Sequence, residues 1–167
     1  CTIPGYKFTI RTDDKEKYIY VTEQSIFGDA IDTLASIFIG DLKYQKYKDN
    51  SQSEIETTGE IITNVYVQED ITYKAVNIST DEKIYTDATE LAQYLLYGDS
   101  HDEKLVTVSA GDSISSLSYN NQISTEEFLI SNPEYTSEDN LLYAGKQVKI
   151  AKVEPQINIV EETYSVN

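Results

Sequence analysis

Two short runs near the start of the chain alternate apolar and polar residues. Residues 6–12 read YKFTIRT and residues 17–22 read KYIYVT. Alternation with a period of two is typical of strands that bury one face. Because the polar residues 11–15 lie between the two runs, the pattern predicts a β-hairpin.

A helical stripe follows the hairpin. Either Thr22 or Ser25 is expected to cap this helix, which continues through Ile39 and stops at Gly40. Its expected buried face consists of Phe27, Ala30, Ile31, Leu34 and Phe38. Residues 41–58 are polar and rich in Lys, Gln and Ser, so we expect an extended excursion there.

Residues 60–79 are the most β-rich part of the chain, and a third helical stripe follows them. Residues 68–70 interrupt the β-rich part, either as the turn of a hairpin or as a bulge in one long strand. Asp87 and Glu90 form an acidic helix start, and Gly98 is the expected end. The expected buried face consists of Ala88, Leu91, Ala92, Leu95 and Leu96.

The last long patterned segment, residues 105–150, predicts a strand, two short helices and a second strand. The first helix is expected to start at Asp112, whose carboxylate can accept backbone hydrogen bonds. Ser124 and Glu127 have the spacing of a capping box at the start of the second helix. Asn132-Pro133 is expected to end that helix, because proline cannot continue the hydrogen-bond ladder.

Composition and charge narrow the classes of partner. The chain has 167 residues, 40% of them hydrophobic, and its 14 tyrosines supply most of the aromatic content. The formal net charge is −16, which would repel the phosphate backbone of nucleic acid and excludes nucleic-acid binding as a function. No apolar run approaches membrane-spanning length.

The order GDSISSL, ISTEEFL, NP and LLYAGKQVKI within residues 105–150 resembles a LysM domain. This small βααβ module occurs in many proteins that bind glycans containing N-acetylglucosamine. Three positions depart from the family pattern. Val106 stands where Tyr or His is frequent, Ser118 where Ala is frequent, and Gln122 where Gly is usual.

The resemblance implies a shallow glycan-binding groove between the loop that starts the first helix and the loop after the second. Carried over by position, the glycan-binding residues are Gly111, Asp112, Ser113, Ile114, Asn132, Pro133, Glu134, Leu141, Leu142 and Tyr143. Gly111 would let the backbone approach a ligand closely, and Ile114 and Leu142 would form an apolar floor for an N-acetyl methyl group. Tyr143 and Tyr135 could stack on sugar faces. For Asp112 and Leu142 a structural role is favoured over direct ligand contact.

The expected fold class is α+β, with an N-terminal α+β domain, a small sheet with two helices, before the βααβ LysM domain. The predicted boundaries are 1–98 for the first domain, 99–104 for a linker, 105–151 for LysM, and 152–167 for a β-extension that begins a further domain. This order is similar to the non-catalytic N-terminal region of Gram-positive LysM, G5 and M23-type cell-wall peptidases. It implies a protein that is extracellular or associated with the cell wall.

Candidate chemistry in this chain is sparse. An M23-type zinc site needs several histidines, and His101 is the single histidine. Cys1 is the single cysteine, and it is either the lipid-bearing first residue of a lipoprotein or a boundary left by cloning. No acidic residue is embedded in an apolar helix or strand face, as a general acid would require. We therefore expect no enzyme activity, metal or cofactor in this chain.

Two functions remain open. The first is a non-catalytic region that anchors a parent protein to peptidoglycan, or to a chitin-type glycan, through N-acetylglucosamine. The alternative is a structural or protein-interaction module of a cell-envelope, spore-coat or phage-tail protein that uses LysM as a scaffold. In that case the tyrosine-rich residues 1–98 would contact a protein partner.

Overall fold

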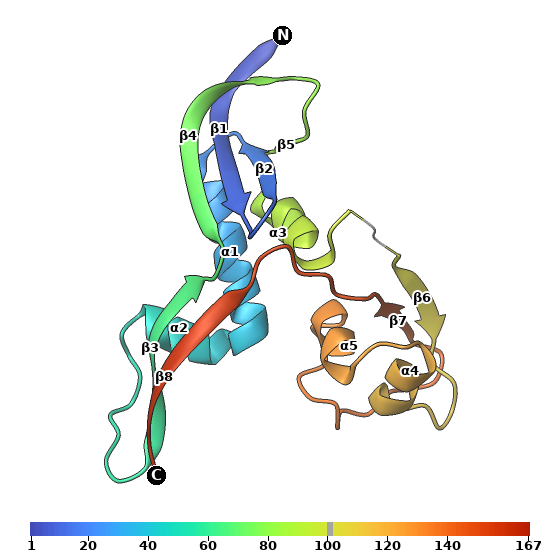
Figure 1. Ribbon diagram of the computed structural model, residues 1–167. Coiled ribbons are helices and arrows are strands. Elements are labelled where there is room, and N and C mark those ends of the chain that lie inside the picture. The colour runs from blue at the N-terminus through green and yellow to red at the C-terminus, as the bar shows by residue number, and fades with distance from the viewer. Residues whose placement is uncertain (100–101) are drawn as a thin grey trace. The chain divides into compact units, whose positions relative to one another are not determined.

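The computed structural model describes residues 1–99 and 102–167, which divide into two compact units. Unit 1 comprises residues 1–95 and 156–167, and unit 2 comprises residues 96–155 (Figure 1). Both contain helices and strands, so the α+β class is confirmed. Part of the predicted 99–104 linker, including His101, lies outside the described residues.

Unit 1 is built on a four-stranded sheet with the order β4-β1-β2-β5. β1 and β2 form the predicted antiparallel hairpin, in which Tyr6 pairs with Val21 and Arg11 with Glu16. β4 runs antiparallel along the whole of β1, and β5 pairs with β2 in parallel. The strand bounds are Thr2–Arg11 for β1, Glu16–Val21 for β2, Asp70–Ser79 for β4 and Ile84–Tyr85 for β5.

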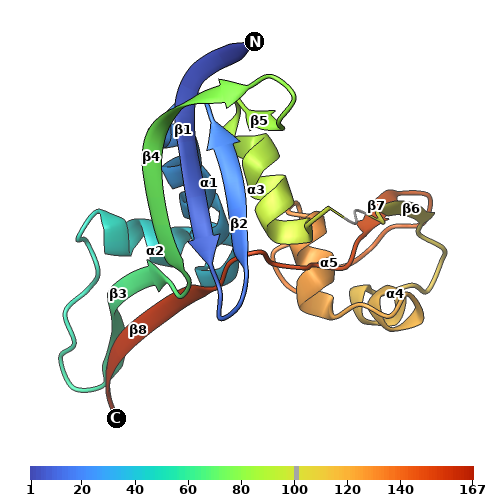
Figure 2. The same ribbon diagram turned by 45° about the horizontal axis from the view of Figure 1, so that its top comes forward.

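Two helices, α1 (Gln24–Ile39) and α3 (Ala88–Tyr97), lie on one face of this sheet (Figure 2). The rings of Phe8 and Phe27 stack between β1 and α1 with centroids 4.1 Å apart. The predicted end of α1 is confirmed, because Gly40 adopts a φ of 109°. Its predicted start is wrong: the N-cap is Glu23, between the two expected residues, and its side chain makes no capping bond.

The polar stretch after Gly40 is not an extended excursion, because it contains the helix α2, Asp41–Lys48. Tyr44 is its buried residue, and the Tyr44 hydroxyl donates a hydrogen bond of 2.7 Å to Asp32 of α1. Lys48 contacts the same carboxylate at 2.8 Å. One aromatic ring and two polar contacts hold this helix, so the sequence carries no apolar stripe that could have predicted it.

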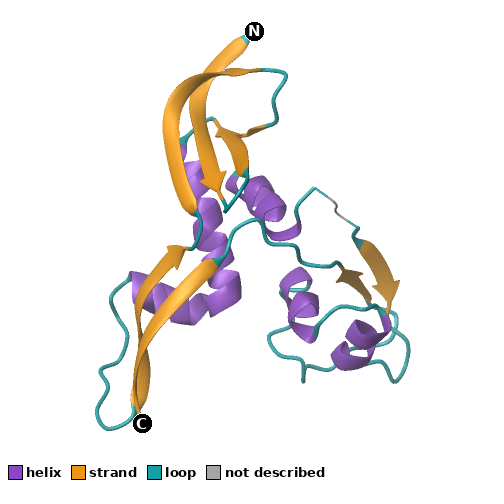
Figure 3. Cartoon of the chain, in the orientation of Figure 1, coloured by secondary structure: helices purple, strands orange, loops and turns teal. Residues whose placement is uncertain are grey.

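β3 (Gly59–Val67) and β8 (Ile159–Val166) form a separate antiparallel ribbon in unit 1 (Figure 3). β3 and β4 therefore pair with different partners, so residues 68–69 join two strands in two sheets rather than closing a hairpin. The backbone of Gln68 donates to the carbonyl of Asn158 at 2.8 Å, which fixes this junction.

The course of the final segment corrects the predicted boundaries. Residues 156–167 belong to unit 1, where β8 pairs with β3, and do not stand apart with residues 152–155 as an extension. Unit 2 is thus an insertion in the sequence of unit 1, between Leu95 and Gln156. The backbone of Gln156 donates to the carbonyl of Leu95 at 2.8 Å, and Glu154 donates to Leu96 at the same distance.

Unit 2 contains the predicted strand-helix-helix-strand order. The two strands pair antiparallel, with Val106 opposite Val148. The bounds are Lys104–Thr107 for β6, Ile114–Asn120 for α4, Thr125–Ser131 for α5 and Gln147–Ile150 for β7. Its core consists of Val108, Ile114, Leu117, Phe128, Val148 and Ile150. Across residues 1–99 and 102–167, no helix is long and apolar enough to span a membrane.

The helix starts of unit 2 test the predicted caps. The capping box of Ser124 and Glu127 is confirmed, with hydrogen bonds of 3.0 and 2.9 Å. The prediction that Asp112 caps α4 is wrong, because Ser113 is the N-cap and exchanges hydrogen bonds with Ser116. Gln122 has a φ of 57°, a conformation that favours the glycine usual in the family.

Candidate functional site

The two loops expected to form the glycan-binding groove start and end at one backbone junction in unit 2. Val108 donates to the carbonyl of Lys146 at 2.8 Å, and Gly145 donates to the carbonyl of Val108 at the same distance. The first loop, residues 109–113, leaves this junction toward α4. The second loop, residues 132–146, returns to it from α5. Both loops are therefore held where β6 ends and β7 begins.

The first loop is a tight turn around Gly111. Gly111 has a φ of 89°, and no atom beyond its two chain neighbours lies within 4 Å of the position that a Cβ would occupy. The turn is closed by Asp112, whose carboxylate accepts from the backbone of Ser109 at 2.8 Å. Asp112 and Ser113 thus hold the turn and the helix start, while the Gly111 backbone faces open space.

Two of the predicted site residues have buried side chains. Ile114 is 0% exposed within the core, so it supports the first loop from below and cannot form the apolar floor that the sequence predicts. Asn132 is also buried, and its amide bonds the carbonyls of Phe128 and Lys149 and the backbone N–H of Lys149. Asn132 therefore ties α5 to β7, where a bound sugar would not reach its amide.

The second loop presents the exposed apolar groups of the candidate site. Leu141 is 74% exposed and Tyr143 is 70% exposed, whereas Leu142 between them is half-buried against the core. Pro133 and Glu134 are exposed as well. Exposed tyrosine and leucine side chains beside an accessible backbone turn are suited to contacting the apolar face of a sugar ring.

Lys146 is a neighbour of this surface that the sequence did not single out. Its ammonium lies 5.1 Å from the ring centroid of Tyr135 and 3.9 Å from the Glu134 carboxylate. The Tyr135 ring in turn packs against Phe128, with centroids 6.1 Å apart. The predicted stacking residue Tyr135 is thus half-buried between the core and a lysine, and Tyr143 is the exposed aromatic ring of this loop.

The arrangement joins eight of the ten predicted residues at the surface of two adjoining loops and places two of them in the interior. The two loops expose backbone polar groups, small apolar contacts and one phenol ring. Within residues 1–99 and 102–167, no group of three or more His, Cys, Asp or Glu side chains could hold a metal ion.

The comparison with protein families finds a match in this part of the chain. The family model of the LysM domain matches residues 106–151, which is 46 of the 167 residues. The matched segment begins in β6 and ends just after β7, so this part of the chain is a LysM domain. No curated protein and no solved structure matches the chain. LysM domains generally bind peptidoglycan or chitin-type glycans and occur in cell-wall-associated proteins.

Proposed function

We propose that the LysM domain at residues 106–151 binds N-acetylglucosamine-containing glycan, and that the chain is a non-catalytic region anchoring a parent protein to peptidoglycan. The observation that carries this proposal is the coincidence of the family match with two adjoining loops that expose Gly111, Leu141 and Tyr143. Such a protein would work outside the cell or at its wall. The parent protein in this proposal is one of the cell wall, because LysM domains occur in cell-wall-associated proteins.

In this proposal the residues divide into contacts and supports. Tyr143 and Leu141 contact the sugar faces, because their side chains are the most exposed apolar groups of the second loop. The Gly111 backbone approaches the ligand, since Gly111 is exposed and the space where a Cβ would lie is open. Leu142 offers the apolar contact for an N-acetyl methyl group, and Pro133 and Glu134 line the far side.

Asp112, Ser113, Ile114 and Asn132 act by holding the two loops in place. Their hydrogen bonds and burial are internal to unit 2. Replacing one of them would weaken binding through a change in loop geometry, and stability would fall with it. A small surface of this kind binds weakly, so repeated contacts along a polymer would supply the avidity that anchoring requires.

The experiment compares two tyrosines of equal chemistry and similar exposure. Tyr143→Ala should weaken the affinity of the full chain for N-acetylglucosamine oligomers by about tenfold, measured by calorimetry, since aromatic contacts of this size contribute about 1–2 kcal/mol. Tyr119→Ala is the control, because Tyr119 is 84% exposed on α4, outside both loops. Equal affinities for the two variants would reject the proposed surface.

A second candidate function, docking to a protein partner, is favoured by the tyrosines of unit 1. Tyr18, Tyr66, Tyr73 and Tyr164 are all at least 45% exposed. Exposed tyrosines of this number are typical of interaction surfaces. This candidate predicts that N-acetylglucosamine oligomers leave the chain unchanged, whereas the LysM proposal predicts saturable binding.

A further inference from the structure

The sheet of unit 1 leaves the face opposite α1 and α3 uncovered, and we call it the open face. Phe8 points toward the helices and stacks on Phe27, so the neighbouring positions of β1 point the other way. Strand pairing extends this assignment to β2 and β4. The open face is formed by Lys7, Thr9, Arg11, Glu16, Tyr18, Tyr20, Asp70, Thr72 and Lys74.

Two lysines lie directly opposite each other on the open face. Lys7 of β1 pairs with Lys74 of β4 in the antiparallel register. Cross-strand neighbours have Cβ atoms about 5 Å apart, and like charges in such a pair are destabilising. The chain has 29 acidic and 13 basic residues, so two lysines directly opposite each other are unexpected by composition. In the described part of the chain, neither lysine forms an ion pair with a carboxylate.

The acidic residues of the open face are at its other end and are already engaged. Glu16 accepts from Arg11 at 2.9 Å and from the Tyr18 hydroxyl at 2.8 Å, and these hydrogen bonds lower the pKa of the Glu16 carboxyl. Asp70 pairs with Arg11 across the strands. The charge of Lys7 also contributes to lowering the pKa of the Glu16 carboxyl, so part of its charge is balanced, but among the described residues of this strongly negative protein neither Lys7 nor Lys74 has a carboxylate in ion-pair contact.

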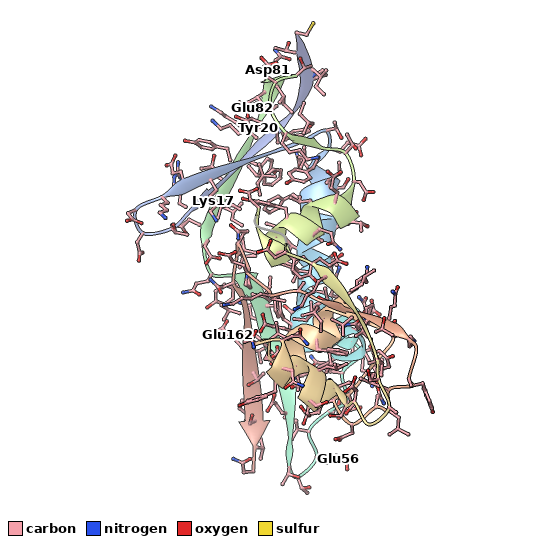
Figure 4. All side chains as sticks on the ribbon, turned by 90° about the vertical axis from the view of Figure 1, so that its right-hand side faces the viewer. Lys17, Tyr20, Glu56, Asp81, Glu82 and Glu162 are labelled. Carbon is pink, nitrogen blue, oxygen red and sulfur yellow. The ribbon has the colours of Figure 1, made fainter. Side chains whose placement is uncertain are left out.

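Aromatic rings border the lysine pair. The Lys7 ammonium lies 4.1 Å from the ring centroid of Tyr18, and Tyr20 pairs with Lys7 on β2. Tyr20 is labelled in Figure 4. Lys17, also labelled there, lies three positions earlier on β2 and therefore belongs to the opposite face of the sheet. The surface thus combines two ammonium groups, two phenol rings and the hydroxyls of Thr9 and Thr72.

We infer that the open face binds carboxylate groups of peptidoglycan stem peptides, with Lys7 and Lys74 as the charged contacts. This inference rests on the proposed function, because the glycan strand held by the LysM domain carries these peptides. Carboxylates of the peptide form ion pairs with the two ammonium groups, and the tyrosines and threonines contact the peptide beside them. It selects peptidoglycan over chitin, since chitin is uncharged.

The test measures binding of the full chain to insoluble peptidoglycan from which covalently attached phosphate polymers have been removed. The variant Lys7→Gln/Lys74→Gln should bind about three- to tenfold more weakly than the wild type, as expected for two exposed ion pairs. Lys46→Gln/Lys104→Gln changes the net charge equally at two exposed lysines that are not among the residues of the open face, and it should bind like the wild type. Amidating the peptidoglycan carboxylates should weaken the wild type to the level of the Lys7/Lys74 variant.

The outcomes separate this inference from the proposed function. The wild type and the Lys7/Lys74 variant should bind soluble N-acetylglucosamine oligomers with the same affinity. If neither protein bound these oligomers, the LysM proposal would be rejected. Equal binding of the two lysine variants to peptidoglycan would overturn the open-face inference alone. The inference would also be overturned if binding to amidated peptidoglycan still depended on Lys7 and Lys74. It would likewise be overturned if binding depended on these lysines only when the phosphate polymers were present. Removing a like-charge pair should not lower stability, which circular dichroism checks.

Discussion

Each of the two units of this chain is stabilised internally, but the contacts within unit 1 span longer stretches of sequence than those within unit 2. In unit 2 every element packs against another within residues 96–155, and its helix starts are set by side chains three positions apart, such as Ser124 and Glu127. In unit 1 the four-stranded sheet depends on β4 pairing with β1, where Arg11 meets Asp70, and the separate ribbon depends on β8 pairing with β3, where Gly59 meets Val166. Local contacts leave a signature in the sequence, whereas distant pairings do not.

The largest expected effect is a loss of stability in the core of unit 2 that leaves the core of unit 1 intact. Phe128 is 0% exposed at the centre of unit 2, so Phe128→Ala should cost about 3–5 kcal/mol and unfold that unit. Unit 1 has its own core and should remain folded. Urea denaturation followed by NMR would show unit 1 resonances unchanged while those of unit 2 collapse. A single joint transition in this variant would mean that the units do not fold separately.

The second prediction concerns a side chain that supports strand β3 in unit 1. The Gln52 amide pairs with the backbone of Ile62 through hydrogen bonds of 2.8 and 2.9 Å, as a neighbouring strand would. Gln52→Ala leaves that N–H and carbonyl without this partner and should lower the free energy of unfolding by about 1–2 kcal/mol. Gln45→Ala on the exposed side of α2 is the control. Equal denaturation midpoints for both variants would show that the amide pairing contributes nothing.

A third prediction strengthens unit 2. The Ser118 hydroxyl is buried and has no hydrogen-bond partner within the described residues. Ser118→Ala restores the residue frequent in the family and should raise the free energy of unfolding by about 1 kcal/mol, because an unsatisfied buried group is removed. Ser115→Ala, at an exposed position of the same helix, should change stability far less. A loss of stability in Ser118→Ala would contradict the account of this position.

The smallest effect is a pH dependence in unit 1. Burial alone would raise the pKa of Asp32, but hydrogen bonds from Lys48 and Tyr44 outweigh it and hold that pKa below its ordinary value. A lowered pKa in the folded state contributes stability above the unfolded pKa, near 4, and this contribution is lost as the pH falls through the folded pKa. Asp32→Asn should therefore reduce the acid sensitivity of α2, by less than about 1 kcal/mol because the pair is partly exposed.

The experiment for Asp32 follows amide exchange or chemical shifts in α2 between pH 6 and pH 2. The wild type should lose protection in α2 below about pH 4, whereas Asp32→Asn should show a lower and flatter protection across the range. Identical profiles for the two proteins would indicate that the contacts of Asp32 with Tyr44 and Lys48 do not stabilise α2.

The comparison also explains which features the sequence could predict. The capping box at Ser124, the end of α5 at Asn132-Pro133 and the whole LysM order rest on neighbouring residues, and each is found in the structure. The helix α2 escaped prediction because a single buried tyrosine holds it. The return of β8 to β3 escaped because alternation predicts a strand but not its partner.

At the candidate site, too, the sequence predicts what neighbouring residues determine and fails to predict what tertiary packing determines. Position in the motif was sufficient to locate the two loops, including the open turn at Gly111. It could not tell which side chains point inward: Ile114 and Asn132 are buried, and the carboxylate of Asp112 is used by Ser109 rather than by the helix start. Burial depends on packing between α4, α5 and β7, which the motif does not encode.

The most direct test of the account is an NMR titration of the full chain with N-acetylglucosamine oligomers. Glycan binding at the two loops should give saturable shifts of the Gly111 amide and of residues 141–143, with the resonances of unit 1 unchanged by these neutral ligands. Saturable shifts centred on any other surface, or a titration that leaves Gly111 and residues 141–143 unmoved, would contradict it.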